Sequence, residues 1–147
     1  MPAVTRFAAS DGDPLFALGR DGRVYAWEGY GNQDPPAAVE NIEGASDVAV
    51  DARRLCAIVE GGRVRCATAV LRATDHCDST QDEFELLPAE PVPGIEGAQQ
   101  IAIAADFGCV TRANHGVTCW GSTEKLGPKA ATKEALRHLG RPIDIYP

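Results

Sequence analysis

Four of the five cysteines form two pairs with the same spacing, Cys56 with Cys66 and Cys109 with Cys119. Each pair flanks a short polar turn. Counting outward from the turn places the two cysteines opposite each other in a β-hairpin, at a non-hydrogen-bonded position where Cα atoms are about 4.5 Å apart. That separation is at the short end of the disulfide range. The spacing predicts two structural disulfides, each stabilising by roughly 2–3 kcal/mol; the alternative is two pairs of reduced, buried thiols.

The fifth cysteine, Cys77, lies in a polar segment beside Asp75, His76 and Asp78. These four side chains could bind a metal ion, or the thiol could pair with another chain. Adjacent residues on an extended loop point in different directions, so we expect a solvated acidic loop without a metal. Zinc is also disfavoured in the hairpins, which offer two thiols each and no Cys-x-x-Cys motif. We expect no cofactor.

The three histidines fall in a predicted loop (His76), a turn (His115) and a helix (His138). The sequence has no glycine-rich phosphate loop, no His-Glu-x-x-His and no Gly-x-Ser-x-Gly. His115 with Asp106 would be the one acid–base pair to consider. We expect no enzyme activity, and catalysis by this pair is the alternative.

The cysteine hairpins are two copies of a threefold repeat. Residues 16–27 align with residues 56–67 and 109–120, with Phe16 and Ala26 in place of the first cysteine pair. Upstream of the second and third hairpins, the motif Ile-Glu-Gly-Ala and a short alternating strand recur. Units of about 40–50 residues with short strands and Gly-rich turns are typical of propeller blades. No unit contains the 10–15 residues of helical spacing that a helical repeat needs.

The repeat predicts an all-β fold, a partial β-propeller of about three blades of antiparallel strands. We expect one repeat domain over residues 1–147, with units at about 4–44, 45–97 (including a loop insertion at 68–87) and 98–147. Residues 128–139 are predicted to form one short C-terminal helix that ends at Gly140. Residues 142–146 resemble the start of another strand, which suggests that the propeller continues.

The third unit carries the motifs Gly-Ile-Glu-Gly-Ala, Gly-Cys-Val and Gly-Val-Thr-Cys-Trp-Gly-Ser. It resembles the repeat of the regulator of chromosome condensation family, in a cysteine-bearing form found in bacterial members, over roughly residues 4–126. The resemblance implies four-stranded blades from a seven-bladed propeller. It also suggests regulators, because members include an exchange factor for a nuclear-transport GTPase and inhibitors of β-lactamases. The first unit departs from the family at Trp27-Glu28-Gly29 and the second at Ala67, and no contact residue of those regulators can be transferred.

The net charge of −7 is unevenly distributed. Residues 73–111 contain eight acidic residues and no Lys or Arg, whereas residues 112–147 are net basic. Such a chain lacks the basic stripe that binds nucleic acid, and no segment is apolar enough to span a bilayer. The N-terminus has no signal-peptide core, while the paired cysteines favour an exported or cell-envelope protein.

We therefore expect a non-catalytic protein-interaction module that binds an unknown protein partner through rim loops. The candidate partner-binding loop is acidic, and its residues are Asp75, His76, Asp78, Asp82, Glu83 and Glu85. Trp27 and Tyr30 are either exposed binding aromatics or packing residues between blades. The alternatives are a metal-dependent hydrolase or other enzyme at the propeller mouth, and an inhibitor or exchange-factor-like regulator. A homo-oligomer or a longer chain would complete the propeller.

Overall fold

The computed structural model describes residues 2–10, 12–27, 35–51, 54–72, 83–104, 107–121 and 143–146. These residues form three antiparallel sheets, which we call blades 1, 2 and 3. Blade 1 contains β1 (Val4–Ser10), β2 (Gly12–Gly19), β3 (Val24–Trp27) and β4 (Ala37–Ala38). Blade 2 contains β5 (Asp47–Asp51), β6 (Arg54–Val59), β7 (Arg63–Arg72), β8 (Glu83–Leu86) and β9 (Glu90–Val92). Blade 3 contains β10 (Ala98–Ala104), β11 (Phe107–Arg112), β12 (Val117–Gly121) and β13 (Ile143–Tyr146).

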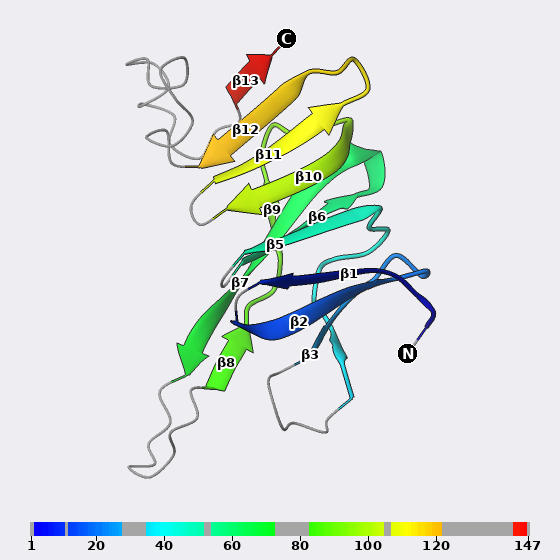
Figure 1. Cartoon of the computed structure of the whole chain (residues 1–147), viewed down its shortest axis with the longest axis vertical. Coiled ribbons are helices and arrows are strands. Elements are labelled where there is room, and N and C mark those ends of the chain that lie inside the picture. The colour runs from blue at the N-terminus through cyan, green and yellow to red at the C-terminus, as the bar shows by residue number, and fades with distance from the viewer. Residues whose placement is uncertain are drawn as a thin grey trace.

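The three blades are stacked along the long axis of the molecule, with blade 2 in the middle (Figure 1). This arrangement confirms the predicted all-β, partial-propeller fold. The predicted helix at residues 128–139 lies outside the described residues. No helix within the described ranges is long and apolar enough to cross a membrane.

Residues 143–146 form the expected strand, β13, which pairs with β12 and becomes the fourth strand of blade 3. One segment differs from the sequence-based expectation. Where a loop was expected at residues 68–87, β7 continues to Arg72 and pairs with β8 from Ala69↔Leu86 to Arg72↔Glu83. The first part of β7 pairs with β9 instead. The described ends of the insertion therefore form a hairpin arm, which extends from blade 2 in Figure 1.

All three central hairpins have three-residue turns whose third residue has a positive φ. Those residues are Gly22 (φ 73), Gly62 (φ 68) and His115 (φ 64). His115 thus takes the left-handed conformation that glycine takes in the other two turns. In the His115 turn the backbone N–H of Gly116 donates to Oδ1 of Asn114 at 3.0 Å.

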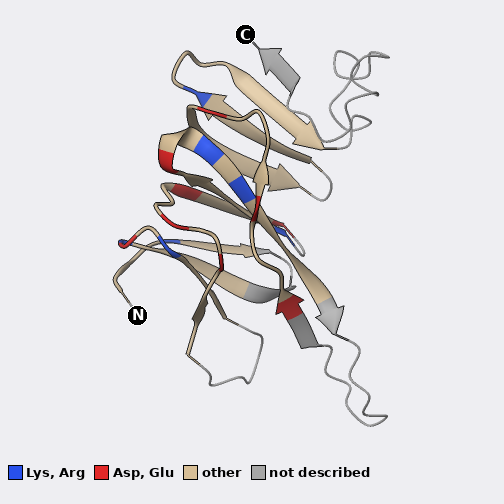
Figure 2. Ribbon diagram, turned by 180° about the vertical axis from the view of Figure 1, so that it is seen from behind, with Lys and Arg blue, Asp and Glu red and all other residues tan. Residues whose placement is uncertain are grey.

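Charged residues are rare on the strands of blade 3. Strands β10, β11 and β12 together carry only Arg112, at the end of β11. Blade 2, in contrast, carries basic residues on β7 and acidic residues on β8 and β9, as the coloured segments of Figure 2 show. The acidic region predicted from residues 73–111 thus reaches the strands of blade 2 and leaves the strands of blade 3 almost uncharged.

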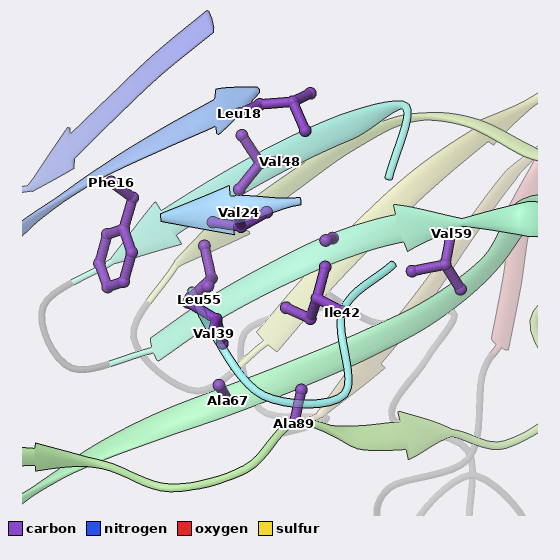
Figure 3. Close-up of a cluster of buried hydrophobic side chains, with 11 residues drawn as sticks. Phe16, Leu18, Val24, Val39, Ile42, Val48, Leu55, Val59, Ala67 and Ala89 are labelled. Atoms are coloured by element: carbon purple, nitrogen blue, oxygen red, sulfur yellow. The ribbon is translucent and has the colours of Figure 1, made fainter. Parts of the chain in front are cut away.

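The core lies between the blades, because blade 2 is buried on both faces. Every residue of β6 from Leu55 to Val59 is buried, and alternate side chains of a strand point to opposite faces. Leu55, Ala57 and Val59 pack with Phe16, Val24 and other residues in the cluster of Figure 3. Cys56 and Ile58 point the other way and pack against blade 3. Two separate apolar interfaces, one on each side of β6, therefore hold the three blades together.

Candidate functional site

Both cysteine pairs are joined by disulfides. Cys56 pairs with Cys66 and Cys109 with Cys119, each with a Cα–Cα distance of 4.1 Å. Cys56 is fully buried within the interface with blade 3. In blade 3, Val110 faces blade 2, so its neighbour Cys109 points to the opposite, outer face. The disulfide position of the repeat thus faces blade 3 in blade 2 and lies on the outer face in blade 3.

The two residues considered for acid–base catalysis are not brought together by any described contact. Asp106 lies outside the described residues. Phe107, which follows it, begins β11, whereas the turn that carries His115 follows the other end of this strand. A strand of six residues separates its ends by about 17 Å. His115 is exposed and lines a shallow polar depression with Gln99, Gln100, Thr111 and Arg112.

The predicted acidic partner-binding loop belongs to the β7–β8 arm. Glu83 and Glu85 lie on β8, where Glu85 is paired with Val70 in the ladder and is exposed. The other four predicted members of the loop lie outside the described residues: Asp75, His76, Asp78 and Asp82. Cys77 also lies outside them. The arm therefore places two of the six predicted residues on a strand, β8.

A buried carboxylate connects the first strands of all three blades. Asp47, at the start of β5, is 5% exposed. Its Oδ1 accepts a hydrogen bond from Nη1 of Arg6 on β1 and from its neighbour's N–H, and its Oδ2 accepts the Ile101 N–H of β10 at 3.1 Å. Arg6, Asp47 and Gln100 occupy the same position of the repeat, one residue before Phe7, Val48 and Ile101. The Asp47 side chain thus links β5 to β1 and β10, which are far apart from it in the sequence.

The outer face of blade 1 is apolar and open. Phe7 is 71% exposed, although its counterparts Val48 and Ile101 in the repeat are 2% and 7% exposed. Leu15 is 51% exposed, whereas its counterpart Leu55 is fully buried. Trp27 is half-buried on the same face, with its ring 6.5 Å from that of Phe7. Trp27 therefore does not pack between two blades of this chain. Tyr30, its predicted companion, lies outside the described residues.

Neither Asp47 nor the outer face was singled out from the sequence. Asp47 precedes an alternating apolar strand, and an acidic residue there looks like an ordinary surface position. The signal for the outer face was available in the repeat, because Phe7 aligns with Val48 and Ile101. Large apolar residues at these equivalent positions imply that all three lie on the same face of their blades.

No family model and no curated protein matches the chain. Human WBSCR16 is similar in structure, with a TM-score of 0.66 and 19% identity over 98% of this chain and 38% of that one. Prp20p from Saccharomyces cerevisiae gives a TM-score of 0.64 with 12% identity, again over 98% of this chain and 38% of the other. A chain in the crystal structure of Kap60 bound to yeast RCC1 (Prp20) gives 0.57 with 13% identity, over 85% of this chain and 34% of that one.

The chain thus spans little more than a third of the length of these proteins. At identities of 12–19% the similarity concerns the fold. The similarity to these propeller structures agrees with the three stacked blades and with the hairpin repeated in each blade. The chain has the fold of part of an RCC1-like β-propeller.

Proposed function

We propose that the chain is a non-catalytic protein-binding part of a propeller, and that its partner contacts the β7–β8 arm. The observation that carries this proposal is the arm itself. Among the described residues, blade 2 is the one blade whose second hairpin strand pairs with two strands along its outer edge, β9 next to the turn and β8 beyond it. Leu86 at the base of the arm packs against the cluster between blades 1 and 2, whereas Glu85 beside it is exposed. Protruding loops on a rigid scaffold commonly bind partners.

The arm's charge specifies the kind of partner. Glu83 and Glu85 lie on β8, and three aspartates occur in the connecting residues 73–82. A partner with a basic surface would be attracted to this group, with an association rate that falls as salt rises. Two of the structurally similar yeast structures concern binding to other proteins: Kap60 in one, Gsp1p and histones in the other. Inhibition and nucleotide exchange would each be a form of such binding.

Shortening the arm tests the proposal. Arg72 and Glu83 are paired, so replacing residues 73–82 by Asn-Gly would close the hairpin with a two-residue turn and leave both strands intact. A length-matched variant would change Asp75, Asp78 and Asp82 to Asn. Each tagged protein would be incubated with extract of the native source, and the bound proteins identified and re-tested as purified components.

We expect the natural chain to bind its partner and both arm variants to lose it. The control is His115→Gly, which changes a turn at another site and should bind normally. Equal capture by the natural and the shortened chain would contradict the proposal. Turnover of an ester, glycoside or phosphate substrate that is lost on His115→Ala, with the fold retained, would favour an enzyme instead.

A further inference from the structure

Strand β8 lies at the end of its sheet, beside β7 in the arm (Figure 1). Within the described residues β7 is its only neighbouring strand, whereas β7 has β6 on one side and β8 and β9 on the other. One edge of β8 therefore presents backbone groups to which no described strand is hydrogen-bonded. Such an edge can accept a further strand from another protein.

A hydrogen bond at the base of the arm shows which backbone groups lie along this open edge. The N–H of Leu87 donates to the carbonyl oxygen of Thr68 on β7 at 2.9 Å. In an antiparallel ladder the N–H and C=O of one residue point to the same side, and those of the next residue point to the other side. The backbone groups of Glu85 therefore point to β7, while those of Phe84 and Leu86 point to the open edge. These two residues offer N–H donors and C=O acceptors to an added strand.

The base of the arm is fixed to the blades on one face and open on the other. Ala69 and Leu86 are paired; Ala69 is buried, and Leu86 packs against the cluster between blades 1 and 2. The next pair, Val70 and Glu85, lies on the opposite face, where Glu85 is exposed. Strand β8 is thus held in position before a partner arrives. Adding a strand to it therefore orders little of this chain, which lowers the entropy cost of binding.

We propose that the partner of the arm supplies an extended basic segment, which adds to the open edge of β8 as an antiparallel strand. This inference rests on the function proposed above and specifies how the partner is held. Main-chain hydrogen bonds with Phe84 and Leu86 would align the segment, and a Lys or Arg side chain opposite Glu85 would lie on the open face. Cross-strand pairs of opposite charge stabilise a sheet, whereas like charges directly opposite each other destabilise it.

The acidic residues of the arm favour this occupant over a second copy of β8. Glu83 and Glu85 alternate along a strand of four residues. Edge-to-edge pairing of two β8 strands would bring acidic residues of both copies together, and charged residues on edge strands are a means by which natural sheets avoid such association. The three aspartates in residues 73–82 add to the same negative charge. The edge therefore repels a copy of itself and attracts a segment in which basic and β-branched residues alternate.

A short peptide, acetyl-Val-Lys-Val-Lys-Val-Lys-amide, is the probe, and it is titrated into the 147-residue chain. Hydrogen exchange of single amides, followed by NMR, measures where it binds. At saturation the amides of Phe84 and Leu86 should exchange at least about tenfold more slowly, because each gains a hydrogen-bond acceptor. The amide of Glu85, which already points to β7, should change little. The same peptide with glutamate in place of lysine should not bind.

Backbone methylation of the peptide distinguishes strand addition from simple attraction between charges. A lysine opposite Glu85 occupies a non-hydrogen-bonded pair, so its N–H points away from β8, whereas the neighbouring valines donate to Phe84 and Leu86. Methyl groups on the valine nitrogens should therefore weaken binding at least about tenfold. Methyl groups on the lysine nitrogens leave the charge and the composition the same, and should leave the affinity unchanged.

A matched pair of substitutions tests the same edge from the side of the chain. Phe84→Pro removes the outward N–H without removing a hydrogen bond to β7, and proline is tolerated at such positions of edge strands. Phe84→Ala keeps this N–H. We expect Phe84→Pro to bind the valine–lysine peptide at least about tenfold more weakly than Phe84→Ala does. Protection of the Glu85 amide in both variants shows that the arm is intact.

Strand addition at β8 would be overturned by absence of peptide binding or by equal effects of the two methylations. Equal binding by Phe84→Pro and Phe84→Ala would also overturn it, as would slowed exchange at Leu71, whose N–H points to the other edge of the arm, in place of Phe84 and Leu86. Failure of the proposed function has a different result: the peptide pairs with β8, but the extract yields no partner that depends on the arm. Capture of a partner through the arm without peptide pairing would instead keep that function and reject strand addition.

Discussion

Replacing Gly62 by alanine should destabilise the chain far more than the same change at Gly61. Both glycines have a positive φ, 79° at Gly61 and 68° at Gly62. Both substitutions therefore incur the left-handed penalty of roughly 1–2 kcal/mol. A Cβ on Gly61 would meet nothing closer than the side chain of Arg63 at 3.7 Å, whereas one on Gly62 would collide with backbone atoms of Gly97 and Ala98. Collision with backbone in a packed interface adds about 1–3 kcal/mol.

The free energy of unfolding should thus fall by about 1–2 kcal/mol for Gly61→Ala and by about 2–5 kcal/mol for Gly62→Ala. Urea unfolding followed by tryptophan fluorescence measures both, because Trp120 lies 5% exposed in the interface that Gly62 adjoins. Protein concentration must be held constant, since any association adds to apparent stability. Equal losses of unfolding free energy for the two variants would refute the view that the turn of blade 2 is in direct contact with Gly97 and Ala98, at the start of blade 3.

Two further predictions concern side-chain hydrogen bonds. Asp47→Ala should lower the free energy of unfolding by about 3 kcal/mol, because the N–H of Ile101 would be left buried without its partner. Arg6→Ala should lower it by less than about 1 kcal/mol, because Arg6 is largely exposed. Similar losses for the two variants in urea unfolding would contradict this prediction. The Tyr25 hydroxyl donates to Oδ2 of Asp21 at 2.7 Å and holds the pKa of that carboxyl below its usual value of 3.8. This hydrogen bond should stabilise the fold at pH values above the ordinary pKa of Asp21, and the stabilisation should be lost as the pH falls through the lowered pKa. Tyr25→Phe should therefore raise the Asp21 pKa in an NMR titration. An unchanged pKa would argue against the hydrogen bond.

The local parts of the fold follow from the sequence. Pairing of Cys56 with Cys66, and of Phe16 with Ala26, depends only on counting from a turn of three residues, and the structure has both registers. The left-handed glycine at Gly22 follows from the same count. Such features involve residues about ten apart, whose arrangement is set by turn geometry and strand alternation.

Features that join distant segments were not predictable in this way. The pairing of β13 with β12 joins residues separated by more than twenty positions, and no periodic pattern connects them. The arm was expected to be a loop because the second repeat has extra residues there. A difference in repeat length does not show whether the extra residues form a loop or paired strands. Asp47 takes its partners from blades 1 and 3. Its role became visible only when three separate strands were placed side by side.

The position of β6 between two separate apolar clusters has a consequence for how the chain unfolds. Blade 2 takes part in both interfaces, whereas blades 1 and 3 each take part in one. In an array where each unit contacts only its neighbours, the end units open at a lower free energy than the middle one. Blades 1 and 3 can therefore detach independently, while the amide hydrogens of β6 exchange with solvent only when both have been lost. The exchange rate of the β6 amide hydrogens therefore measures how cooperatively the three blades unfold.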